Sequence, residues 1–281
     1  MLKASKKTKK SKDFLLSFIV WAAAFITFSV LIYMIAYILI QGVPHLKLSL
    51  FSLKYTSENV SVFPAIITTI IMTALSLLIA VPLGVFTAIY LVEYANKKNR
   101  FVGFVRITAE TLSGVPSIVY GLFGLLFFVT YLGWGFSLLA GSFTLSIMIL
   151  PLIMRTTEEA LKAVPDSFRE GSYGLGAGRL RTIFRIVLPS AVPGVLAGII
   201  LAIGRIVGET AALIYTAGTV ADVPTSIFSS GRTLAIHMYA LSSEGLHVNE
   251  AYATAVVLLI VVVGINTISS FIAKRFVYGQ I

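Results

Sequence analysis

Hydrophobic residues occur in long runs that alternate with short polar segments along most of the chain. Six runs are close to or above the roughly 20 residues that an α-helix needs to cross the hydrocarbon core of a bilayer. These predicted spans cover residues 14–40, 63–92, 107–130, 136–154, 191–217 and 251–273. No polar segment is long enough to form a separate globular domain. The pattern therefore predicts one all-α membrane domain over residues 14–281, preceded by a basic segment at 1–13.

Composition agrees with this interpretation. Hydrophobic residues make up 57% of the 281 residues and charged residues only 12%, which excludes an ordinary water-soluble domain. The chain has no cysteine, so disulfides and thiolate chemistry are excluded as well. The first run follows several lysines, as the apolar core of a signal peptide does. Because the run is too long for such a core and no small-residue cleavage site follows it, we expect a retained first span.

The net charge of +10 is distributed by topology rather than as a nucleic-acid-binding patch. Eighteen of the 22 basic residues lie before the first span, after the second, between the fourth and fifth, or after the sixth. The other loops hold only Lys47, Lys54 and Arg232. Since positive loops remain in the cytoplasm, this asymmetry predicts a multi-pass protein with both termini and the 155–190 loop on the cytoplasmic side.

Three charged residues fall inside otherwise apolar runs, namely Glu110, Arg205 and Glu209. A charge at the bilayer centre costs at least about 2.5 kcal/mol, so such residues are expected to face a partner or a water-filled pathway. Arg205 and Glu209 are four residues apart, so a continuous helix would place them on one face, where they could pair. Two compatible roles follow for Arg205: a structural salt bridge, or an anion site beside which Thr210 adds a hydroxyl.

The third run contains a sequence predicted to break the helix, which reads SGVPS over 113–117. Proline removes a backbone donor and glycine loosens the helix, and the freed polar groups need a partner or water within the membrane. The candidate pathway residues here are Ser113, Gly114, Pro116 and Ser117, one turn after Glu110. The alternative is an ordinary proline kink that helps the helices to pack.

A charged, glycine-rich island lies between the fourth and fifth spans and reads EGSYGLGAGRLRTIFRIVLP over 170–189. We expect a short helix within 165–178, with Asp166 as its cap, Arg169 and Glu170 exposed, and glycines at its end. Such a helix can fit a groove of a soluble partner, or it can rest on lipid head groups. The candidate docking residues are Arg169, Glu170, Gly174, Gly176, Leu188 and Pro189.

Other chemistry is not supported by the sequence. The glycines at 174–178 are not followed by the Lys-Ser/Thr pair of a phosphate-binding loop. His45, His237 and His247 lack the spacing of metal ligands, and no nucleophile with a neighbouring base is evident. We therefore expect neither a metal site nor catalysis in this chain.

The island resembles the EAA motif of ATP-binding-cassette (ABC) import permeases, through Glu170, Gly176, Ile186 and the Leu188-Pro189 pair. Further stretches resemble the PstA-type family of phosphate importer permeases. They are AIYLVEY at 88–94, LSGVPSIVYGLF at 112–123, RTTEEA at 155–160, Val164-Pro165, and Arg205 with GETA at 208–211. The chain departs from the motif at Gly171-Ser172, where the family usually has two alanines, and this departure puts the details of the docking contact in question.

The resemblance implies a type I importer permease with the MetI-like fold, in a bacterial or archaeal cytoplasmic membrane. It implies a heterodimer with a PstC-like permease, two PstB-like ATPases that use ATP and Mg, and an extracytoplasmic phosphate-binding protein. This chain would need no cofactor of its own. Arg205 would then stabilise phosphate, Glu209 would hold Arg205 after the ion leaves, and the 113–117 break would line or gate the passage. The alternatives are a permease for sulfate or molybdate, and a membrane scaffold or sensor that docks a signalling protein.

Overall fold

The computed structural model describes residues 2–96 and 99–278, and its regular elements over these residues are all helical. Five helices are long and apolar enough to cross a membrane. They are α1 (Leu2–Gly42), α2 (Phe63–Ile89, prolonged by the wide turn Tyr90–Tyr94), α5 (Leu138–Lys162), the continuous helix Arg179–Val207, and α11 (Val248–Tyr278). A sixth segment consists of α3 (Arg100–Ser113) and α4 (Ser117–Gly124, prolonged by Leu125–Tyr131), which meet at an angle of 103°. The predicted fold class is confirmed, with the third span bent.

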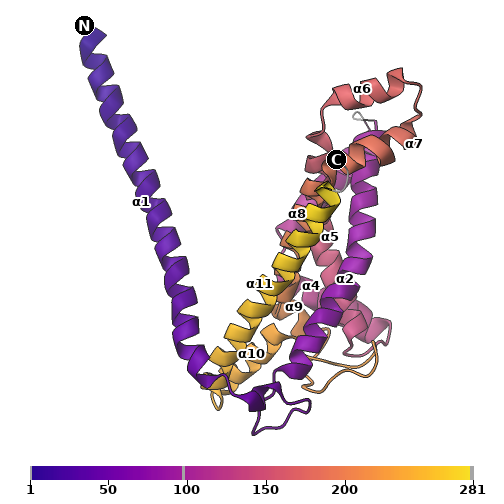
Figure 1. Ribbon diagram of the computed structural model, residues 1–281. Helices are drawn as coiled ribbons and strands as arrows, with labels where there is room; N and C mark the ends of the chain where they lie inside the picture. The colour runs from indigo at the N-terminus through magenta and orange to yellow at the C-terminus, as the bar shows by residue number, and fades with distance from the viewer. Residues whose placement is uncertain (1, 97–98, 279–281) are drawn as a thin grey trace.

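The core of the bundle lies where α2, α5 and α8 (Leu188–Val207) pack against one another (Figure 1). Met72, Leu145, Ile149 and Ile206 are nearly or completely buried there. Because lipid tails are as apolar as these side chains, close van der Waals packing rather than the hydrophobic effect holds the helices together here. This packing fixes α8, and with it Arg205, relative to the rest of the bundle.

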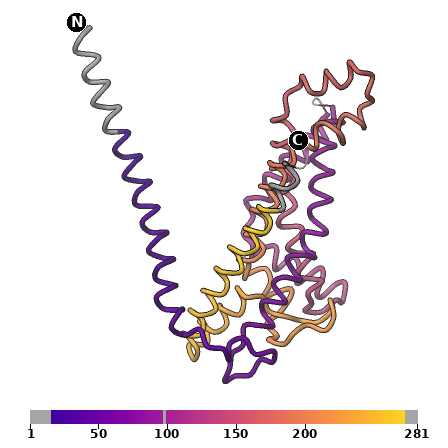
Figure 2. The backbone as a smooth tube through the Cα atoms, viewed as in Figure 1, coloured from indigo at the N-terminus to yellow at the C-terminus, as the bar shows by residue number. Residues whose placement is uncertain are grey.

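The first helix stands apart from the bundle and meets it only near its carboxyl end (Figures 1 and 2). None of its most apolar 18-residue window is buried, and Trp21 and Phe25 are 77% and 72% exposed. Close to the junction, the hydroxyls of Tyr37 and Tyr252 are 3.4 Å apart. Most of the apolar surface of α1 is therefore available to lipid or to another chain.

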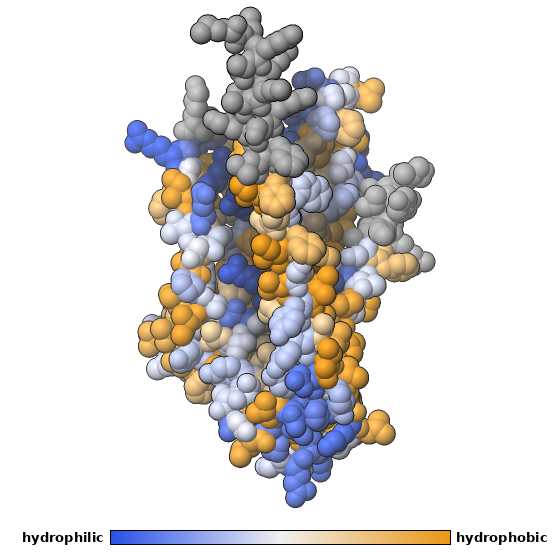
Figure 3. Space-filling model, turned by 90° about the vertical axis from the view of Figure 1, so that its left-hand side faces the viewer, coloured by the Kyte–Doolittle hydropathy of each residue, from blue (hydrophilic) through white to orange (hydrophobic). Residues whose placement is uncertain are grey.

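The polar helices gather at one end of the molecule. The short helices α6 (Asp166–Gly174) and α7 (Arg179–Thr182) lie there, at the same end of the molecule as the carboxyl end of α11 (Figure 1). At the other end lie η1 (Val43–His45), η2 (Leu48–Phe51) and α10 (Leu234–Glu244). In Figure 3, hydrophobic residues run along the middle of the visible face, and hydrophilic residues gather at its lower end.

The predicted boundaries of the fourth and fifth spans were wrong, because both helices extend into the polar loop between them. The fourth span was expected to end at 154, but α5 continues to Lys162. The fifth was expected over 191–217, but its helix begins at Arg179 and ends at Val207. Ion pairs four residues apart support the polar end of α5, with Arg155 to Glu159 at 3.2 Å and Lys162 to Glu158 at 2.6 Å. Both ends of the predicted 155–190 loop are thus helical continuations of spans.

A buried histidine organises the end of the bundle opposite α6. His237, on α10, donates from Nε2 to the carbonyl oxygen of Val60 at 3.2 Å, and its Nδ1 is buried without a hydrogen-bond partner. The His237 and Tyr55 rings are perpendicular to each other, and the Arg232 guanidinium carbon lies 4.5 Å from the centre of the Tyr55 ring. Burial first, and then the charge of Arg232, lower the pKa of His237 to about 3.

We expect the stability of the protein to fall as the pH decreases from about 6.5 to about 3, because only the unfolded chain binds a proton at His237 over that range. The loss from this group is at most about 1.4 kcal/mol per pH unit. Thermal unfolding in detergent at about pH 7 and about pH 4.5 checks this for the wild type and His237→Gln. The variant should lose less stability between the two conditions, and equal losses would contradict the prediction.

Candidate functional site

The chain breaks at the predicted place in the third span. Helix α3 ends at Ser113 with Gly114 as its C-cap, and α4 begins at Ser117 after Pro116, whose ψ of 142° is extended. The Tyr120 hydroxyl donates to the Leu112 carbonyl oxygen at 2.7 Å and so bridges the break. Because Ser113, Gly114 and Pro116 remain exposed, the break faces outward from the packed core of this chain.

A second break follows α8 and corrects one prediction. The helix ends at Val207 with Gly208 as its C-cap, and a new short helix, α9 (Ala211–Ile214), begins three residues later. Glu209 therefore does not continue the helical face of Arg205. Its Oε1 instead accepts a hydrogen bond from the Ala212 amide at 3.1 Å. Within the described residues the predicted Arg205–Glu209 ion pair is not formed, because Gly208 ends the helix between them.

The two breaks are packed against each other. Gly121 of α4 lies so close to α9 that a Cβ there would come within 2.8 Å of the Ala212 Cα. Beside this contact is a largely apolar cavity of about 630 Å³, whose lining includes Ile118, Thr210 and Tyr252. The structure thus brings Ile118, which follows the 113–117 break, and Thr210 to one cavity.

Arg205 lies half-buried near the end of α8. It lines a cavity of about 630 Å³ together with Leu152, Gly204 and Asn266 of α11, and it is close enough to Tyr120 to interact electrostatically with its hydroxyl. No ion pair of Arg205 is found among the described residues. An unneutralised guanidinium beside a cavity offers a fork of donors to an anion.

Asn266 was not among the residues predicted from the sequence. Its Oδ1 is buried without a hydrogen-bond partner, and the residue contributes to the lining of the same cavity as Arg205. A neutral amide within an apolar run carries no charge signal, so a search for intramembrane charges passes over it. The signal available was the polar series Asn266, Thr267, Ser269 and Ser270 within the last span.

Glu110 occupies a different environment from Arg205. It lines a smaller cavity of about 200 Å³ between α3 and α5, where charged side chains predominate. Here the buried Glu158 forms ion pairs with Arg106 at 2.8 Å and with Lys162 at 2.6 Å. Glu110 itself is exposed and forms no ion pair with another described residue. Glu110 therefore lies near the third-span break without a charged partner among the described residues.

The polar island forms an arm that projects from the bundle. Helix α6 is shorter than the predicted 165–178, because Gly176 takes a positive φ of 83° that ends the turn. Glu170 is exposed as predicted, and the arm encloses a groove of about 640 Å³. The groove lining includes Phe168, Gly171, Leu175, Gly176, Arg181 and Arg185. Gly174 ends α6, and Leu188 with Pro189 begins α8.

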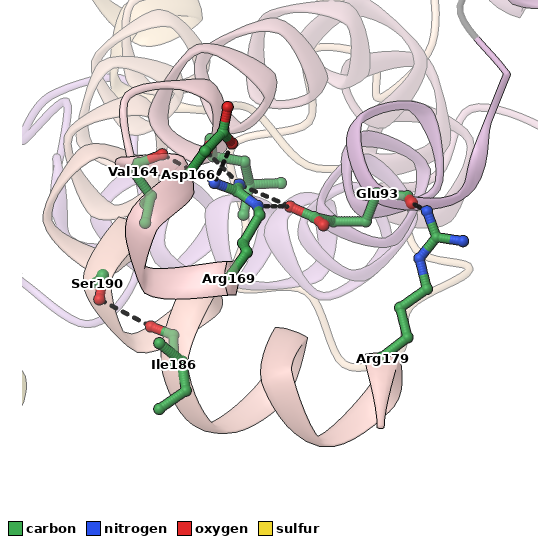
Figure 4. A network of polar contacts seen from close by, with 8 residues as sticks. Glu93, Val164, Asp166, Arg169, Arg179, Ile186 and Ser190 are labelled. Carbon is green, nitrogen blue, oxygen red and sulfur yellow. Dashed lines mark hydrogen bonds and ion pairs between the residues drawn. The ribbon is translucent and has the colours of Figure 1, made fainter. Parts of the chain in front are cut away.

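Two details of this arm were predicted wrongly. Asp166 does not cap α6, and its Oδ1 instead accepts from Arg169 Nη1 at 3.2 Å. The Arg169 side chain, expected to be exposed, is only 13% exposed and turns toward the bundle (Figure 4). It pairs with Glu93 at the end of α2, a partner that is distant in sequence. The exposed face of α6 therefore includes Glu170 but not the Arg169 side chain.

Apolar helices with paired breaks beside an unneutralised intramembrane arginine are typical of a membrane transport subunit. Residues 80–278 match the family of the binding-protein-dependent transport system inner membrane component. This match covers more than half of the chain, which therefore belongs to that family. The family is one of permease components, not of enzymes.

Individual relatives agree with the assignment. The chain is 34% identical over 233 residues to the probable ABC transporter permease protein YqgI of Bacillus subtilis, covering 78% of this chain and 79% of that protein. It is 37% identical over 219 residues to the phosphate transport system permease protein PstA 1 of Mycobacterium tuberculosis, covering 77% and 71%. The resemblance to PstA-type permeases inferred from the sequence is confirmed.

Solved structures agree on the fold. A chain from the bacterial alginate ABC transporter, in complex with its alginate pentasaccharide-bound periplasmic protein, superposes with a TM-score of 0.69. It is 16% identical and covers 95% of this chain and 96% of that chain. A chain of the inward-facing MetNI methionine ABC transporter gives a TM-score of 0.59 at 20% identity, covering 76% and 94%. At such identities the likeness supports the importer permease fold alone.

Proposed function

We propose that this chain is the permease subunit of an ATP-driven importer of inorganic phosphate, and that Arg205 is its anion site. The observation that carries the proposal is the half-buried guanidinium of Arg205, which lines a cavity within the membrane part of the bundle and has no acidic partner among the described residues. The phosphate transport names of relatives at 36–37% identity support the choice of anion.

Phosphate would pass along the exposed face formed by the two breaks. Ser113, Gly114, Pro116 and Ser117 would contribute backbone and hydroxyl groups at the first break, and Thr210 a hydroxyl at the second. Glu209 would act by holding the start of α9 through the Ala212 amide rather than by reclaiming Arg205. Because Ser113, Gly114 and Pro116 face outward, a second permease chain of the PstC type would complete the passage.

Energy would come from other subunits. Two PstB-like ATPases that use ATP and Mg would bind the arm through Glu170, Gly174 and Gly176. The movement of the arm would then reach α8 at its first residues, Leu188 and Pro189. An extracytoplasmic phosphate-binding protein would deliver the ion at the opposite end. The basic loops support an orientation with both termini on the cytoplasmic side of the inner membrane.

Uptake of labelled phosphate into proteoliposomes tests the substrate. The purified complex of this chain with its partner permease, ATPases and binding protein should accumulate phosphate only with ATP. A roughly hundredfold excess of unlabelled sulfate or molybdate should reduce uptake less than about twofold, because a phosphate-selective site is expected to bind these anions at least about 100-fold more weakly, a difference of about 2.7 kcal/mol. If the complex accumulated sulfate or molybdate with ATP but not phosphate, that anion would be the substrate and phosphate would not. A complex that binds its partners without transporting any of the three would favour the scaffold alternative.

A further inference from the structure

Arg169 connects the docking arm to the second span through a buried ion pair. Its Nε and Nη2 donate to Glu93 Oε1 at 3.1 and 2.7 Å (Figure 4). The two side chains are only 13% and 5% exposed. Removal of Arg169 would leave the Glu93 carboxylate as an uncompensated buried charge, and removal of Glu93 would leave Arg169 paired with the exposed Asp166 alone among the described residues. The contact between α6 and α2 is therefore held by an interaction that resists separation.

The same guanidinium also holds the end of α5. It donates from Nη2 to the Leu161 carbonyl oxygen at 3.0 Å and from Nη1 to the Val164 carbonyl oxygen at 2.8 Å. These carbonyls lie at the carboxyl end of α5, where the helix dipole favours a cation. Only arginine has enough donors in a planar fork to serve a carboxylate and two carbonyls together. One side chain thus joins α6 to both α2 and α5.

The second limb of the arm is fixed at the same point. Arg179, at the start of α7, donates to the backbone carbonyl oxygen of Glu93, and its guanidinium lies 4.9 Å from the centre of the Tyr94 ring. Both limbs of the arm therefore meet the wide turn Tyr90–Tyr94 that ends α2. By contrast, Glu170 on the neighbouring position of α6 is exposed and free to contact another chain.

We propose that Arg169 is a positioning residue that transmits the movement of α6 to α2 and α5 through Glu93, and does not itself contact an ATPase. The inference rests on the proposed function, because it concerns how an ATPase seated on the arm moves the spans. It divides the work of the arm between neighbours: Glu170 binds the motor subunit, and Arg169 couples that binding to the membrane helices. Glu93 acquires a role in transport that its position in the second span does not suggest.

The test uses the complete complex in proteoliposomes, with the variants Glu93→Gln, Arg169→Gln, Arg169→Lys and the double Gln variant. Arg100→Gln is the matched control, because Arg100 is exposed at the start of α3. We expect the ATPase subunits to remain bound in every variant. Phosphate carried per ATP should fall at least about tenfold in both single Gln variants and less in Arg169→Lys, which keeps the charge but loses the fork. The double variant should be no worse than the poorer single one, because both remove one link.

Loss of the ATPase subunits from Arg169→Gln would make Arg169 a docking contact and overturn the proposal. Wild-type coupling in Glu93→Gln, or a double variant whose defect is the product of the single ones, would overturn it too. Stimulation of ATP hydrolysis by the binding protein provides a readout that does not depend on the cargo. If the wild-type complex showed that stimulation without phosphate uptake, the substrate would be wrong, while lost stimulation in the variants would still support the link.

Discussion

Replacement of Arg205 by glutamine is expected to reduce ATP-driven phosphate uptake at least about 100-fold while the complex remains assembled. Glutamine retains hydrogen-bonding capacity and much of the length, but it removes the charge and the paired donors that fit two oxygens of one anion. Hydrogen bonds to charged groups contribute about 1.5–3 kcal/mol each, so two lost bonds account for an effect of this size. The measurement is the initial rate of uptake in proteoliposomes, with assembly checked by size-exclusion chromatography.

Two controls make this result specific. Arg205→Lys keeps the charge without the fork, and we expect it to retain intermediate uptake. Arg100→Gln removes a charge of the same kind from an exposed position and should transport as the wild type does. Normal uptake by Arg205→Gln would show that phosphate does not need this guanidinium, and Arg205 would then have a structural role beside Tyr120 and Asn266.

Reversal of the charge at Glu170 is expected to release the ATPase subunits. Glu170 is exposed on α6 beside a groove with apolar residues on its walls, and Leu175 is 91% exposed there. Glu170→Arg would place a positive charge against the basic group of the ATPase that the carboxylate is proposed to contact. We expect copurification of the ATPase with Glu170→Arg to fall at least about tenfold, which corresponds to a loss of about 1.4 kcal/mol.

The matched control for this reversal is Arg100→Glu, which changes the charge elsewhere on the same side of the bundle. It should leave copurification unchanged. Normal ATPase binding by Glu170→Arg, together with normal uptake, would remove Glu170 from the docking surface. It would favour the alternative in which the arm rests on lipid head groups, a role that Arg181 and Arg185 suit.

The sequence predicted the helical spans, the break at 113–117 and the position of the arm, because each depends on a local property. Apolar run length reports a span, and the Gly-Val-Pro sequence reports a break whatever surrounds it. The predicted ion pair between Arg205 and Glu209 was wrong for a reason that is also local. Helical spacing was assumed through Gly208, a residue that commonly ends a helix.

The burial of Arg169 had no local signal. Its partner Glu93 lies 76 positions earlier in the chain, and helical periodicity relates only residues a few positions apart. An arginine on a short polar helix is ordinarily exposed, and only the packing of α6 against the end of α2 turns it inward. Asn266 was not predicted for a different reason. Its place beside Arg205 depends on how α11 packs against α8, which the sequence of α11 alone does not show.

The wide turn Ile183–Val187 joins α7 of the arm to α8, and each of its hydrogen bonds encloses one residue more than an α-helical turn does. An α-helix rotates by about 100° per residue, so the number of residues in this turn sets the direction in which every later side chain of α8 points. Substitutions within the turn leave that direction unchanged, whereas loss or gain of a single residue would rotate Arg205 away from its cavity. Selection on this stretch is thus expected to act on its length more strictly than on its composition, and relatives should align through it without gaps.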